Sequence, residues 1–107
     1  MKVLNRIKKN VEFSKVIDEG TLVKSDSLTL YFLKNDLGYT RFGISIPKKS
    51  GTAVVRNKMK RQIRAIIASD VDLKKSVDCV LIARKQFDIN DFQKTKLDIN
   101  NLMKKVG

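Results

Sequence analysis

Histidine is absent from the 107-residue sequence, and its 11 acidic residues are scattered along the chain. Without histidine the chain lacks the usual general base, the commonest metal ligand and every catalytic triad built on an imidazole. The scattered acids indicate solvated surface rather than a carboxylate cluster for catalysis or metal binding. We therefore expect no catalytic residue and no metal site in the protein, and any hydrolysis it serves should be performed by something it binds.

Cysteine is nearly absent too, occurring only as Cys79, so an intramolecular disulfide is impossible. Cys79 begins the longest unbroken apolar run, which ends at Ala83, and this predicts a buried structural thiol rather than a nucleophile. No stretch is long enough to span a bilayer, and the basic N-terminal residues lack the apolar segment of a signal peptide. A cytoplasmic protein without a membrane partner is expected, since its thiol would stay reduced there.

Positive charge is abundant. Lysine and arginine number 23 against 11 aspartates and glutamates, giving a formal net charge of +12. A small folded domain tolerates this self-repulsion more easily beside a polyanion, most commonly a nucleic acid, with an anionic membrane surface as the main competitor. The length suits one compact domain spanning residues 1–107, and the 42% hydrophobic content is ordinary for a globular chain.

Hydrophobic periodicity predicts the secondary structure. Alternating or continuous apolar residues predict strands over residues 27–33, 40–46 and 77–84, the last of them central in a sheet. Apolar residues at helical spacing predict helices over residues 10–19, 53–69 and from 90 onward. Asn10 and Asn90 are the expected N-caps, and Gly20 is expected to end the first helix at its C′ position. This mixture of helices and strands predicts an α+β fold.

The first two predicted strands each have two different faces. One face carries apolar residues, namely Leu28, Leu30, Phe32, Phe42, Ile44 and Ile46. The other carries Tyr31, Arg41, Gly43 and Ser45. The apolar face is expected to join the core, whereas small residues on the other face leave room for a ligand to approach. An ordinary solvent-facing surface explains this second face equally well.

No acidic residue occurs between Asp36 and Asp70. The basic residues of this interval are Arg41, Lys48, Lys49, Arg56, Lys58, Lys60, Arg61 and Arg64. On the predicted helix Asn57, Arg61 and Arg64 share one face, with Lys60 beside them, opposite an apolar stripe of Val55, Met59, Ile63, Ile66 and Ile67. A rigid row of cations suits a phosphate backbone. The alternative is a basic solvated helix face, but the absence of acids favours polyanion binding.

The segment from Gly51 to Arg64, GTAVVRNKMKRQIR, closely resembles the signature of the bacterial ribonuclease P protein family. The family's Arg-Asn-Arg motif falls on residues 56–58, and flanking matches at residues 6–10, 48–49 and 82–85 extend the resemblance over nearly the whole chain. The resemblance implies a small α+β domain with a central mixed β-sheet, about three flanking helices and a left-handed βαβ crossover.

The resemblance also implies a function. The family assists endonucleolytic removal of the 5′ leader from precursor tRNA, while a catalytic RNA subunit performs the hydrolysis with bound Mg²⁺. The implied partners are that RNA and precursor tRNA, with no DNA and no organic cofactor. The implied contacts to the RNA subunit are Arg56, Asn57, Lys58, Lys60, Arg61 and Arg64. The implied leader-binding residues are Phe13, Ile17, Tyr31, Ser45, Lys48 and Lys49.

Three residues depart from the family pattern. Lys58 replaces the second arginine of the motif, Thr52 stands where asparagine is common, and Ile17 stands where an aromatic is common. Lys58 keeps the charge but loses a planar donor fork, and Ile17 puts a second stacking surface in question. Phe13 also fits a core position, because an apolar helix stripe has the same pattern.

Three alternatives compete with the ribonuclease P hypothesis. A basic ribosomal protein, or another structured-RNA-binding protein, explains charge and size equally well but does not predict the ordered motif. A stand-alone nuclease is disfavoured by the missing histidines. A membrane-surface protein would need free bulky apolar residues on its basic helix, and these are expected to lie in the core.

Overall fold

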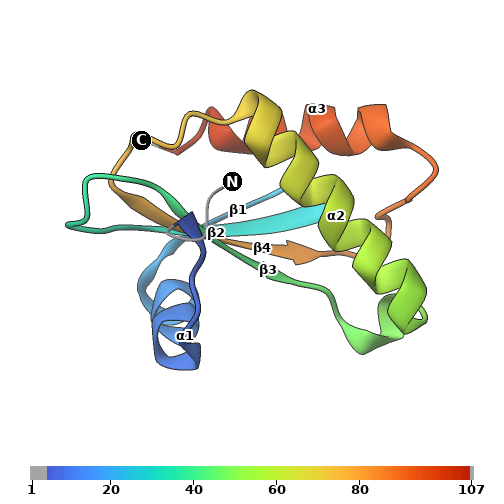
Figure 1. Ribbon diagram of the computed structural model, residues 1–107, viewed down its shortest axis with the longest axis horizontal. Helices are drawn as coiled ribbons and strands as arrows, with labels where there is room; N and C mark the ends of the chain where they lie inside the picture. Colours follow the sequence, from blue (N-terminus) through green and yellow to red (C-terminus); the bar gives the residue numbers. More distant parts are fainter. Residues whose placement is uncertain (1–4, 107) are drawn as a thin grey trace.

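The computed structural model describes residues 5–106, which form an α+β domain (Figure 1). Its elements in chain order are α1 (Asn10–Glu19), β1 (Thr21–Lys24), β2 (Leu28–Lys34), β3 (Arg41–Ser45), the 3₁₀ turn η2 (Lys48–Ser50), α2 (Ala53–Asp70), β4 (Val77–Ala83) and α3 (Phe92–Met103). All six predicted elements are present, and the predicted α+β class is confirmed.

The strands form one mixed sheet in the order β1-β2-β4-β3. β1 pairs with β2, and β2 with β4, in antiparallel orientation, whereas β3 runs parallel to β4. The prediction that residues 77–84 supply a central strand is confirmed, since β4 lies between β2 and β3 and is buried on both faces. β3, α2 and β4 thus make a βαβ unit, and the left-handedness of its crossover stays a prediction of the resemblance.

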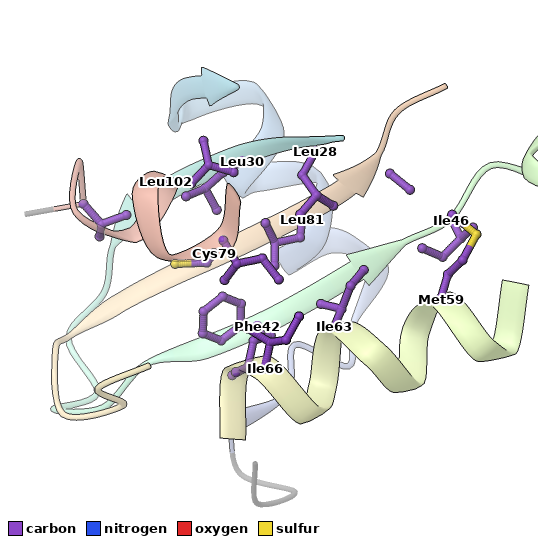
Figure 2. Close-up of a cluster of buried hydrophobic side chains, with 14 of the residues drawn as sticks. Leu28, Leu30, Phe42, Ile46, Met59, Ile63, Ile66, Cys79, Leu81 and Leu102 are labelled. Carbon is purple, nitrogen blue, oxygen red and sulfur yellow. The ribbon is translucent and has the colours of Figure 1, made fainter. Parts of the chain in front are cut away.

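Two helices cover one face of the sheet. In Figure 1, α2 and α3 lie together on this face, and α1 lies alone on the other. The main core fills the space beneath α2 and α3, and most of its side chains are drawn in Figure 2. Met59, Ile63, Ile66 and Ile67 of the predicted α2 stripe are buried there, and Val55 packs at its border.

A smaller cluster lies beneath α1. Its buried members are Ile7, Val16 and Val80, and the partly buried side chains around them are Phe13, Ile17, Tyr31, Leu33 and Ile82. The sheet face that was expected to be either open or plainly solvated is therefore partly covered by a single short helix.

β1 was not expected from the sequence. Its four residues are too few for a clear alternation, and only Val23 is even partly buried. The segment becomes a strand because it pairs with β2, with Val23 opposite Leu30. Its position at the edge of the sheet explains why its side chains lack a buried pattern.

The structure corrects the three predicted helix boundaries. Asn10 is already the first residue of α1, and Lys9 occupies the N-cap without a side-chain bond. In α3 the cap is Asp91, whose Oδ1 accepts from the Lys94 amide at 3.1 Å, rather than Asn90. Gly20 is the C-cap of α1 with φ −78°, not a left-handed residue at C′. Glycine is needed there because a Cβ would overlap the carbonyl oxygens of Val16 and Phe32.

Candidate nucleic-acid interface

The outward side of α2 carries a surface that we call the cationic face. It consists of Arg56, Asn57, Lys58, Lys60, Arg61 and Arg64. Asn57, Lys58, Arg61 and Arg64 are exposed, and Arg56 and Lys60 are half-buried. Within residues 5–106 none of these cations takes part in an ion pair with a carboxylate. Their charge is therefore available to an outside polyanion.

The start of α2 is held by two local bonds. Thr52 caps the helix, because its Oγ1 accepts from the Val55 amide at 3.3 Å. Arg56 Nε donates to the Gly51 carbonyl at 3.3 Å, which orients the first arginine of the motif over the helix N-terminus. Thr52 thus performs the capping role that an asparagine also performs, and this departure leaves the helix start intact.

Arg41 does not belong to this free surface, although it lies in the same acid-free interval. Its Nε and Nη2 donate to the two carboxylate oxygens of Asp78 at 2.9 and 2.7 Å, and its Nη1 donates to Glu12 Oε2 at 3.0 Å. The hydrogen bonds to Asp78, above all, raise the pKa of Arg41 against the opposing effect of burial. Asp78 and Glu12 are remote from Arg41 in sequence, so the absence of acids between Asp36 and Asp70 did not reveal that Arg41 is paired.

Lys48 and Lys49 are exposed in η2, between the end of β3 and the start of α2. Lys49 also lines a surface cavity of about 400 Å³ together with Arg84 and Lys85, which follow β4. The carboxyl ends of the parallel strands β3 and β4 meet at the same edge, and this brings the two basic segments together. Sequence reasoning gave Arg84 and Lys85 no site role, although a basic pair directly after a buried strand was a usable signal.

The face beneath α1 brings together four of the residues implied in leader binding. Phe13, Ile17 and Tyr31 belong to the same cluster and are only partly buried, so each side chain packs against the sheet and keeps part of its surface exposed. The ring of Phe13 lies on Gly43, where any Cβ would overlap it. Ser45 is on the same face of β3, two residues further along.

Two further residues on this face had not been predicted as site residues. Thr29 and Ile82 lie in the same cross-strand row as Ser45, and all three are partly exposed. The sequence does not show on which face of the sheet Ile82 lies, because residues 79–83 form a continuous apolar run without alternation. The register of β4 against β2 and β3 places Ile82 on the face beneath α1.

A small hollow of about 130 Å³ connects the two surfaces at the β3 edge. Its lining includes Phe13 from α1, Gly43 and Ile44 from β3, and Lys60 and Arg64 from α2. Residues assigned by the resemblance to two different RNAs are therefore neighbours across the edge of the sheet.

Chemistry within the protein is limited. Within residues 5–106 no group of three or more cysteine, aspartate and glutamate side chains could hold a metal ion. Burial, with a smaller contribution from the charge of Asp78, raises the pKa of Cys79 to about 12, so the thiol stays protonated. In the same part of the chain, no helix combines the length and hydropathy that a bilayer crossing requires.

These features define an α+β domain with a free cationic helix on one side and a half-covered sheet face on the other. Comparison with known proteins agrees with this class. The family model described as Ribonuclease P matches residues 1–107. The chain therefore belongs to the ribonuclease P protein family.

Curated relatives and solved structures are similar to this chain over nearly its whole length. The ribonuclease P protein component of Mesoplasma florum is 41% identical over 105 residues, covering 96% of both chains. That of Bacillus velezensis is 40% identical and covers 100% of this chain and 93% of the relative. The RNase P protein from Thermotoga maritima superposes with a TM-score of 0.86 at 29% identity, covering 95% of this chain and 97% of that one. The Staphylococcus aureus RNase P protein superposes with a TM-score of 0.81 at 32% identity, covering 95% of this chain and 96% of that one.

Family membership carries the general function. The chain is an RNA-binding protein subunit of ribonuclease P, a ribonucleoprotein endoribonuclease of tRNA processing, and its partner is the RNA subunit of that enzyme.

Proposed function

We propose that the protein binds two RNAs at once in the cytoplasm, the RNA subunit through the cationic face of α2 and precursor tRNA through a second surface. The observation that carries this proposal is the separation of roles on α2. Its apolar side is buried in the main core, while Asn57, Arg61 and Arg64 point outward. A cation that is fixed on a rigid helix and unpaired in the protein can neutralise a phosphate without first breaking an internal ion pair.

The second surface, the leader face, consists of Phe13, Ile17, Tyr31, Ser45, Lys48 and Lys49. We assign to it the single-stranded 5′ leader. Tyr31 offers a partly exposed ring, and stacking on a ring holds unpaired bases without regard to their sequence. Lys48 and Lys49 offer exposed charge for the backbone. Ile17 is aliphatic, so only apolar contact is assigned to it.

The hydrolysis itself is assigned to the RNA subunit and its bound Mg²⁺. The protein residues contribute by neutralising phosphates where two RNA chains approach one another, which lowers the repulsion between them. Less Mg²⁺ is then needed for the same degree of assembly.

A reconstitution tests the proposal. Purified protein is mixed with a bacterial ribonuclease P RNA and a precursor tRNA at low Mg²⁺, and release of the 5′ leader is measured on a gel. We expect cleavage that the protein stimulates and that is absent when the RNA subunit is omitted. Leader-specific cleavage by the protein alone would point to a stand-alone nuclease, and failure to stimulate any compatible RNA subunit would point to another structured-RNA-binding role.

Tyr31→Ala separates the two surfaces. Loss of a stacking ring should weaken binding of leader-bearing tRNA to the assembled complex by about 1–3 kcal/mol, while mature tRNA binds as before. Dissociation constants for the two ligands measure this difference. Tyr39→Ala, in the turn between β2 and β3, is the matched control and should change neither value. An equal loss for both ligands with Tyr31→Ala argues against Tyr31 in the leader face.

A further inference from the structure

α1, the helix that contributes Phe13 and Ile17 to the leader face, has little buried surface of its own. It lies alone on its side of the sheet, as Figure 1 shows, and Val16 is its only fully buried residue. Among residues 5–106, no side chain caps its N-terminus. Because this apolar packing is limited, a polar contact can contribute to where the first turns of α1, including Phe13, lie over the sheet.

Three side chains, which we call the Arg41 clamp, supply this contact. The guanidinium of Arg41 joins Asp78 of β4 through two parallel bonds and reaches Glu12 of α1 through a third. The side chains of Arg41 and Asp78 are only 15% and 10% exposed, and that of Glu12 is 36% exposed. Asn35 Nδ2 also donates to Asp78 Oδ1 at 2.8 Å. The planar fork of arginine makes all three bonds at once, which an ammonium could not do with the same geometry.

The clamp lies beside the contact between Phe13 and Gly43. Glu12 precedes Phe13 on α1, and Arg41 shares a face of β3 with Gly43, two residues away. Two neighbouring contacts thus fix α1 on β3, one ionic and one apolar. Without the ionic contact, only Phe13 and the apolar cluster around Val16 would determine how the helix lies over the sheet.

We propose that Arg41 is a positioning residue for the 5′ leader: through Glu12 it holds α1 so that Phe13 stays over Gly43 in the leader face. This inference rests on the proposed leader face. Arg41 touches no RNA in this scheme, because its donors face Asp78 and Glu12. Its effect on the leader is transmitted by the position of Phe13.

Glu12→Ala is the variant that tests the clamp. It leaves the bidentate pair between Arg41 and Asp78 in place, whereas Arg41→Ala would leave a buried carboxylate unpaired and threaten folding. In the assembled ribonucleoprotein we expect affinity for leader-bearing tRNA to fall roughly three- to tenfold, the net worth of one typical hydrogen bond, with mature tRNA and the RNA subunit bound as before. Asp18→Ala, exposed on the same helix, is the matched control and should leave all three affinities unchanged.

The sign of the effect separates positioning from simple electrostatics. Removing a carboxylate near RNA would by itself tighten binding of any phosphate chain. Weaker leader binding by Glu12→Ala therefore supports the clamp, and unchanged or tighter binding overturns it. A double variant adds a second criterion: once Phe13→Ala has removed the ring, Glu12→Ala should have no further effect, and additive losses overturn the proposed route through Phe13. A wild-type complex that shows no preference for leader-bearing tRNA overturns the leader face itself.

Discussion

Asp98 of α3 accepts two charged hydrogen bonds, one from within its own helix and one from Ser27, which directly precedes β2. Ser27 Oγ donates to its Oδ2 at 2.6 Å, and Lys94 Nζ donates to its Oδ1 at 3.0 Å. Burial favours the protonated acid, but the bonds from Ser27 and Lys94 outweigh it and hold the pKa of Asp98 below its ordinary value. The folded state therefore holds this proton less tightly than the unfolded chain does. The carboxylate stabilises the fold above the unfolded pKa, and this stabilisation is lost as the pH falls through the folded pKa.

Asp98→Asn should make the free energy of unfolding less dependent on pH. At neutral pH the variant is expected to lose about 1–3 kcal/mol, because the amide forms weaker bonds to Ser27 and Lys94 than the carboxylate does. Below about pH 4 the difference from wild type should shrink. Urea unfolding at several pH values measures both effects. Asp36→Asn, an exposed turn position, should show neither, and parallel pH curves for wild type and Asp98→Asn would contradict the argument.

α2 separates folding from binding by using opposite sides of one helix. Ile63 is fully buried at the middle of the apolar side, between Met59 and Ile66. Each of these residues follows the last by one turn, so they form a continuous ridge against the sheet (Figure 2). The ridge determines which residues are left to face outward.

Ile63→Ala should destabilise the domain without altering its RNA contacts. A cavity in the core is expected to lower the free energy of unfolding by about 2–5 kcal/mol. Affinity for the RNA subunit, measured at a temperature where the variant is still folded, should match wild type. Ala65→Ser, exposed on the same helix, controls for helix propensity and should stay within about 0.5 kcal/mol. Reduced RNA affinity of fully folded Ile63→Ala would show that the two sides are not independent.

Elements with a strong hydrophobic periodicity could be predicted from the sequence, whereas β1, which forms by pairing with a neighbouring strand, could not. α2 was predicted over residues 53–69 and observed over Ala53–Asp70, because its apolar residues recur over several turns. β1 has no such pattern and exists only through its bonds to β2. The cap of α3 was placed one residue early because Asn90 and Asp91 are both good capping residues, and only the backbone geometry selects Asp91.

The same distinction applies to the candidate site. The exposure of Asn57, Arg61 and Arg64 followed from helical spacing alone. The ion pairs of Arg41 could not be predicted in this way, because Glu12 lies in a helix and Asp78 in a strand far along the chain. Contacts of this kind depend on the sheet order, in which β4 rather than β2 pairs with β3.

The whole molecule is a cation with an uneven distribution of charge. Its formal net charge is +12, and the Arg41 clamp uses two of its carboxylates internally. No acid occurs between Asp36 and Asp70, whereas three aspartates lie between residues 88 and 98 around the start of α3. Attraction to RNA should therefore be strongest on the side that carries the first turns of α2.

Affinity for the RNA subunit should fall steeply with salt, and Arg61→Ala should make the fall less steep. Removing one phosphate contact is expected to reduce the slope of log K against log salt concentration by about 0.7–0.9. Filter binding over a range of KCl concentrations measures the slope. Lys104→Ala removes an equal charge after α3 and should leave the slope almost unchanged. Equal slopes for Arg61→Ala and wild type would remove Arg61 from the contact.

β4, one of the two inner strands of the sheet, is also the last strand to be synthesised. β2 and β3 pair with β4 and not with each other, so neither gains its central partner until residues 77–83 have left the ribosome. α2 emerges before them, with its basic residues complete but no finished sheet to bury its apolar ridge. A nascent chain can therefore attract RNA by charge early, yet it can hold RNA in the native geometry only after translation has passed Ala83.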